Sequence, residues 1–202
     1  MAESTLETHP EEVVINDMRL WLERAVIGLN LCPFAKAVHV KQQVHYAVSQ
    51  ANTTEQLLQD VRLQCLALLD CPLTERETTL LMAPWCLEDF LDFNDFMAEV
   101  DDLLVDLELD GVLQVASFHP DFQFAGTMLE DLSNLTNQAP YPTLHLLREE
   151  SIDRAVEAFP DAELIFETNI ETVQSLGQKG WSALGLKRTL PLERPVKASP
   201  KE

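Results

Sequence analysis

The chain has 202 residues, of which 46% are hydrophobic, and its formal net charge is −20. This length predicts one domain with a substantial core. Such a negative surface repels phosphate backbones and anionic lipids, so neither nucleic acid nor a membrane surface is expected as a partner. The charge is uneven, because residues 187–202 are basic and have few apolar side chains, which predicts a flexible basic tail.

The N-terminus and the cysteines bear on the compartment. No apolar run is long enough to span a bilayer, and the acidic residues 1–11, expected to be disordered, lack the features of a signal peptide. A cytoplasmic protein is therefore expected. Its four cysteines contain no CxxC pair and are expected to be reduced thiols rather than disulfides or a structural zinc site. They are Cys32, Cys65, Cys71 and Cys86.

The first half of the chain alternates helical and strand-like patterns. Apolar residues at helical spacing predict a first helix over 12–29, and alternation predicts a half-buried strand over 39–49. Thr53 and Gln56 form a capping box, which begins a second helix that continues to residue 69.

The second half predicts three more strands. They cover residues 78–83, 112–118 and 143–147, and helices are predicted over 87–107, 151–159, 162–176 and 179–184. Because most strands are separated by helices, we expect an α/β or α+β sandwich with about four strands in one sheet, packed by five or six helices. Residues 12–186 are expected to form this single domain.

Polar side chains are dense between the last two predicted strands. His119 and Asp121 directly follow one strand, while His145 and Arg148 lie in or just after the next. A long connection of this kind often carries a binding site, and ligands collect beyond the carboxyl ends of strands in α/β sheets. The alternative is that His119 and Asp121 only form a turn around Pro120.

Arg148 stands in an acidic stretch. Its guanidinium could hold a carboxylate or phosphate through two parallel hydrogen bonds. A salt bridge to Glu149 or Glu150 is the alternative.

Cys32 lies where the first predicted helix must end, because Pro33 disfavours helical geometry at the preceding residue. The nearby Lys36 could lower the pKa of the Cys32 thiol and make it reactive. The alternative is that Cys32 packs as a small apolar side chain.

These residues support three hypotheses. The first is an enzyme acting on a small anionic molecule, with Cys32 or a bound water as nucleophile, His119 as general base and Asp121 orienting it. In it Arg148 anchors the substrate, and the substrate-binding set is completed by His145 and Tyr141. No cofactor is expected.

The other two hypotheses are a binding protein without chemistry and a metal protein. The pocket could bind a small ligand or a partner chain, with aromatic side chains as apolar walls, although such aromatics are more often core. Alternatively His119, Asp121 and His145 could hold a divalent metal, an arrangement not favoured here because no motif fixes two ligands on one element.

Five segments carry a resemblance to a known family: GLNLCPFAK, DFNDF, QVASFHPDFQFAG, NQAPYPTLHLLREES and TNIETVQSLG. Together they resemble an uncharacterised bacterial family of similar length, catalogued as domain of unknown function 1415. The resemblance spans roughly residues 12–180 and implies no activity, substrate or catalytic residue.

Overall fold

The computed structural model describes residues 9–159 and 164–190. Their helices are α1 (Pro10–Trp21), η1 (Leu22–Ile27), α2 (Ala35–Val40), α3 (Thr54–Asp70), α4 (Phe90–Asp106), η2 (Leu132–Asn137), α5 (Glu149–Ala158) and α6 (Ile165–Ala183). Their strands are β1 (Val44–Val48), β2 (Thr78–Met82), β3 (Leu113–Phe118) and β4 (Thr143–Arg148).

The four strands form one mixed sheet in the order β1-β2-β4-β3. β1 and β2 are parallel and are joined by the crossover helix α3, whereas β4 pairs antiparallel with both β2 and β3. This confirms the predicted α/β architecture with four strands.

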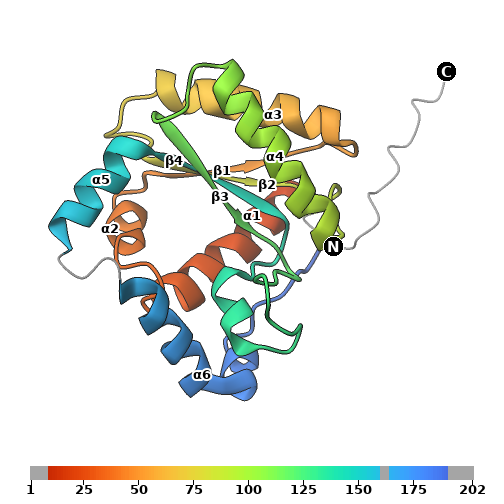
Figure 1. The fold of residues 1–202 in the computed structure, drawn as a ribbon, viewed down its shortest axis with the longest axis vertical. Helices are drawn as coiled ribbons and strands as arrows, with labels where there is room; N and C mark the ends of the chain where they lie inside the picture. The colour runs from red at the N-terminus through yellow and green to blue at the C-terminus, as the bar shows by residue number, and fades with distance from the viewer. Residues whose placement is uncertain (1–8, 160–163, 191–202) are drawn as a thin grey trace, which may run out of the picture.

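Helices cover both faces of this sheet, as Figure 1 shows. One face packs against α3 and α4, and a large buried apolar cluster lies between them. The other face packs against α1 and η1. On β2 successive side chains divide between the faces, so Leu81 enters the first cluster and Leu80 the second.

Several predicted boundaries differ from the structure, and three of these differences matter for the fold. The strand predicted from residue 39 begins only at Val44, because α2 and a turn with Gln42 at φ 59° occupy the residues before it. The first helix widens into the π-helix η1 after Trp21. The helices predicted over 162–176 and 179–184 form one element, α6, with a kink at Gly177; residues 162 and 163 lie outside the described ranges.

The connection between β3 and β4 is ordered around the fully buried Asn134. Its Oδ1 accepts hydrogen bonds from the Phe124 amide at 3.1 Å and the Thr127 hydroxyl at 2.9 Å, and its Nδ2 donates to the Met128 carbonyl at 2.9 Å. One amide side chain thus satisfies backbone groups that a long loop would otherwise leave unpaired.

Candidate functional site

His119 is buried directly after β3, beside the aromatic rings of α4. Its Nε2 lies 3.1 Å from the Leu87 carbonyl oxygen, and its Nδ1 accepts a hydrogen bond from the Asp121 amide at 3.0 Å. Since a carbonyl only accepts, the proton is on Nε2 and the ring is neutral. Burial lowers the pKa of His119, an effect that the bond to Leu87 and the nearby Asp121 oppose.

This geometry commits both ring nitrogens of His119 to the backbone. The Phe122 amide also donates to the His119 carbonyl at 3.2 Å, which closes a turn around Pro120, while Asp121 itself is exposed. The arrangement matches the turn that the sequence left as the alternative. A histidine with a hydrogen bond at each nitrogen has no free lone pair with which to act as a general base.

Cys32 lies at the joint between η1 and α2, on the α1 side of the sheet, whereas the His119 ring packs against Phe93 of α4 on the other side. No hydrogen bond, ion pair or ring contact joins Cys32 to His119 in the part of the chain that the structure describes. Burial raises the pKa of the Cys32 thiol, and hydrogen bonds from the Phe34 and Ala35 amides lower it in part. The thiolate expected from Lys36 is therefore not favoured.

His145 is on β4 and faces the α1 side. The Thr78 hydroxyl donates to the Leu146 carbonyl at 2.6 Å, so it accepts from His145 Nε2–H at 2.7 Å. The Phe118 ring lies 6.1 Å away, centroid to centroid. Burial lowers the pKa of His145 to about 4, which keeps the imidazole neutral.

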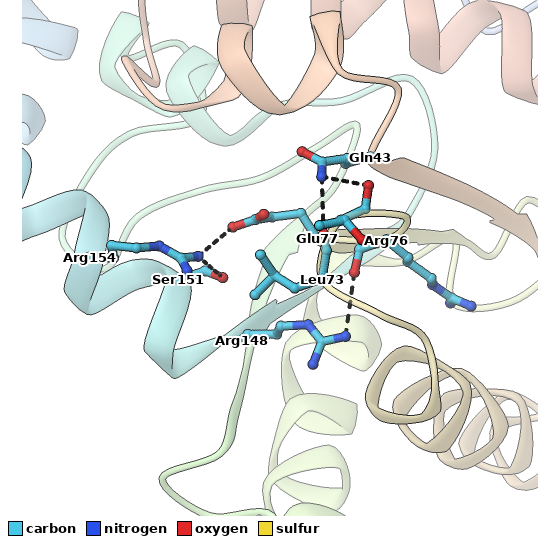
Figure 2. Close-up of polar contacts among 8 residues, drawn as sticks. Gln43, Leu73, Arg76, Glu77, Arg148, Ser151 and Arg154 are labelled. Atoms are coloured by element: carbon cyan, nitrogen blue, oxygen red, sulfur yellow. Dashed lines mark hydrogen bonds and ion pairs between the residues drawn. The ribbon is translucent and has the colours of Figure 1, made fainter.

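Arg148 holds the carboxyl end of α3. Its Nη2 donates to the carbonyl oxygens of Leu68, Cys71 at 2.7 Å and Arg76 at 3.4 Å, and Figure 2 shows the side chain reaching from the end of β4 toward this loop. A cation there satisfies unpaired carbonyls and the negative end of the helix dipole. Within the described ranges, neither Glu149 nor another carboxylate forms an ion pair with it.

A neighbouring arginine, on α5, does form an ion pair. Arg154 contacts Glu77 at 2.9 Å and also donates to the Ser151 hydroxyl, as Figure 2 shows. Beside Arg148 lies an open cavity of about 190 Å³, lined by Leu69, Gly111, Val112 and Glu150. The acidic Glu150 on its wall weakens this cavity as a site for an anion.

The described residues contain no group of three or more His, Cys, Asp or Glu side chains placed to hold a metal ion. The two histidines of the metal hypothesis are bonded to different parts of the protein, while Asp121 lies next to His119. His119 and His145 each direct Nε2–H to a protein acceptor, on opposite sides of the sheet.

Tyr141 is fully buried and belongs to a polar network on the α1 face. Its hydroxyl donates to Asp17 Oδ2 at 2.6 Å and accepts from the Leu190 amide at 3.1 Å. Burial raises the pKa of Tyr141, and the hydrogen bond to Asp17 raises it further. Tyr141 therefore acts as a fixed neutral donor inside the domain.

Residues 187–190, predicted as the start of a flexible tail, pack against the domain. Leu190 is buried in the apolar cluster between the sheet and α1, which we call the α1-side cluster. Arg188 donates to the Pro84 carbonyl at 2.8 Å, and its guanidinium lies 5.3 Å from the centre of the Tyr141 ring. Composition did not predict this contact because one buried leucine, the polar side chains of Arg188 and Thr189 and two backbone amides make it, rather than a run of apolar residues. Residues 191–202 lie outside the described ranges.

The pocket that combines aromatic and charged walls lies on this side of the molecule. It is open to solvent and has a volume of about 220 Å³. We call it the tryptophan pocket, and its lining residues are Trp21, Pro120, Gln138, Ala139, Pro140, Trp181, Leu186, Lys187 and Arg188.

Each wall of the tryptophan pocket has a structural origin. Trp21 is fixed because its indole N–H donates to the Gln138 carbonyl at 2.8 Å and its ring meets Phe118 edge-on. Trp181 comes from the last turns of α6. Arg188 also contacts Glu88 at 3.4 Å, but its Nε is buried and has no hydrogen-bond partner among the described residues.

The lining residues do not stand out in the sequence. Trp21 fits the apolar stripe of the first helix, and Lys187 and Arg188 read as tail. The available signal was indirect: Pro120 and residues 138–140 belong to two of the five segments that carry the family resemblance.

Comparisons with known proteins give a family and nothing finer. A family model described as "Protein of unknown function (DUF1415)" matches residues 13–183. No curated protein and no solved structure shows significant similarity to the chain. None of the helices in the described ranges is both long and apolar enough to cross a membrane.

Proposed function

We propose that this chain, which belongs to the DUF1415 family of proteins of unknown function, binds a small organic anion with a planar or apolar group in the tryptophan pocket. The observation that supports this is the pairing of two indole rings with Lys187 and Arg188 around one open cavity. Binding pockets typically combine apolar walls with a few convergent polar groups.

The charge of the ligand follows from the walls. The chain carries −20 overall, yet Lys187 and Arg188 stand together at this cavity, and the partner of Arg188, Glu88, lies outside the lining. Both cations attract a carboxylate or phosphate, and the exposed Lys187 ammonium can donate hydrogen bonds to it. The same net charge leads us to propose neither nucleic acid nor a membrane surface as a partner.

The size of the ligand follows from the volume. Drug-sized ligands occupy sites of about 300–1,000 Å³. The tryptophan pocket has about 220 Å³, so it suits a smaller molecule with one ring and one acidic group. Trp181 is partly exposed and offers an indole face on which such a ring can stack, while Trp21, only 3% exposed, contributes a buried wall.

Catalysis at Cys32, His119, Asp121 and Arg148 is the weaker candidate. It requires a nucleophile and a base within hydrogen-bond reach, with an anchor for the substrate. Cys32 and His119 lie on opposite sides of the sheet, and the Nη2 of Arg148 is occupied by carbonyl oxygens. Binding without chemistry requires none of these contacts, and it is the function we favour.

The test is an NMR titration that follows the indole N–H signals of Trp21 and Trp181. Benzoate is the probe, and benzylamine supplies a cation of similar shape. We expect benzoate, and not benzylamine, to shift both signals in a saturable way. Lys187→Glu should weaken benzoate binding by roughly tenfold or more, while Lys179→Glu, an exposed charge change on α6 outside the lining, should leave it unchanged.

Two results would contradict the proposal. Equal shifts with benzoate and benzylamine would remove the anion preference. Equal weakening by the two lysine variants would attribute the binding to net charge alone rather than to the pocket wall.

A further inference from the structure

The basic wall of the tryptophan pocket belongs to a segment that we call the strap, residues 186–190. α6 ends at Ala183, and Gly185, with a φ of 66°, lets the chain turn away from the helix. Arg24 donates to the Leu184 carbonyl at 2.8 Å. The strap then crosses to α1 and the Tyr141 region. It lies beyond residue 183, where the match to the family model ends.

The end of the strap is held by the carboxylate of Asp17. The Thr189 amide donates to Oδ2 at 2.8 Å, and the Thr189 hydroxyl donates to Oδ1 at 2.9 Å. Tyr141 donates to Oδ2 and in turn accepts from the Leu190 amide. Two consecutive amides of the strap, those of Thr189 and Leu190, thus donate to Asp17 and Tyr141, which are hydrogen-bonded to each other.

The position of Asp17 makes these bonds informative. It lies on α1 among the apolar residues of the α1-side cluster and is only 8% exposed. A buried carboxylate is costly unless its oxygens are filled by donors. Tyr141 supplies one of the three donors and Thr189 the other two, so the strap completes this acceptor.

We propose that Asp17 is a positioning residue, which docks the strap and thereby places Lys187 and Arg188 over Trp21 and Trp181. The two cations come directly before Thr189 in the sequence, so the clamp fixes the backbone within two residues of them. The part of this inference that concerns a ligand rests on the proposed function. The part that concerns the strap does not.

The strap part is tested without any ligand. In Asp17→Asn we expect the Thr189 and Leu190 amides to exchange with deuterium roughly 10- to 100-fold faster, because they lose bonds to a charged acceptor and its partner. Trypsin should cut after Lys187 faster by a similar factor. The β2 amides of Leu80 and Leu81 should keep their protection, which separates strap release from global unfolding.

Matched variants guard against a trivial result. Glu12→Gln removes an exposed carboxylate from the same helix and should change neither rate. Thr189→Pro removes the strap's own donor while leaving α1 intact, so it applies even where Asp17→Asn fails to fold. We expect Thr189→Pro to release Leu190 and expose Lys187 in the same way.

The ligand part is read from benzoate affinity. Release of the strap with at least a tenfold loss of benzoate affinity supports the inference, and release with unchanged affinity overturns the positioning role while leaving the proposed function standing. Unchanged exchange in both strap variants overturns the clamp. If wild-type protein binds no benzoate, the proposed function fails. The positioning role is then judged by whether Asp17→Asn shifts the Trp181 indole signal, because release of the strap moves Lys187 and Arg188 away from Trp181.

Discussion

The two faces of the sheet differ in which segments their buried polar contacts join. The face under α3 and α4 combines a large apolar cluster with the buried Thr79 and His119, which bond to Arg76 and to the Leu87 and Asp121 backbone. The face under α1 buries the carboxylate of Asp17 and the hydroxyl of Tyr141, which bond to each other and to Thr189 and Leu190. Apolar burial stabilises both faces, while the second also depends on polar contacts between segments far apart in the sequence. Both the tryptophan pocket and the strap lie on the second face.

The largest loss of stability is expected on the face under α3 and α4. Phe96→Ala removes a side chain that is 1% exposed between α4 and the sheet, and we expect a loss of about 3–5 kcal/mol in the free energy of unfolding. Leu91→Ala on the same helix is the control, since Leu91 is 71% exposed and should change stability by less than about 0.5 kcal/mol. Urea denaturation measures both. Similar losses in the two variants would show that burial in this apolar cluster is not what stabilises the packing of α4 on the sheet.

On the face under α1, the loss of a single hydroxyl should lower the free energy of unfolding. Tyr141→Phe keeps the ring but leaves Asp17 without one donor and the Leu190 amide without its acceptor. We expect a loss of about 1–3 kcal/mol, because buried polar groups left unpaired are costly. The same denaturation series measures it, and an unchanged midpoint would mean that water replaces the hydroxyl at no cost.

Sequence reasoning succeeded where burial alone decides the structure. The stripe of Leu57, Val61, Cys65 and Leu68 on α3 and the apolar run of β2 were predicted correctly, because hydrophobic periodicity records which side faces the core. The order of helices and strands along the chain also agrees with the prediction, whereas the order of the strands in the sheet, β1-β2-β4-β3, was not predicted.

The site followed much less well, because its contacts join distant parts of the chain. His119, Tyr141, His145 and Arg148 stood out as polar residues near strand ends, but local sequence does not show that their partners are Leu87, Asp17, Thr78 and Leu68. Asp17 sits on an apolar helix and Thr189 in a charged tail, and neither pattern signals the other. Periodicity reports burial and carries no record of hydrogen-bond partners.

A pH effect should separate the faces further. The pKa of His145 falls from an ordinary 6.5 to about 4 in the folded protein, so the unfolded chain takes up the proton first as pH falls. The stability contributed by the neutral ring is present above pH 6.5 and is lost as pH falls toward 4. Because the side chain is only partly buried, we expect a loss of about 1 kcal/mol between pH 7 and pH 5. His145→Gln should lower this pH dependence; identical pH profiles would contradict it.

The smallest effect concerns cysteine chemistry, with one thiol on each face. Burial raises the pKa of Cys65, on α3, to about 11, and burial also raises the pKa of the partly exposed Cys32 on the α1 side. Both are thiols at pH 7, and the thiolate is the reactive form. We therefore expect iodoacetamide to label Cys32 faster than Cys65, yet roughly tenfold slower than it labels Cys32 in the denatured chain. Peptide mass spectrometry measures each rate separately, and Cys32→Ser identifies its signal. Native labelling of Cys32 as fast as in the denatured chain would mean that its surroundings do not suppress the thiolate, and would return it to consideration as a nucleophile.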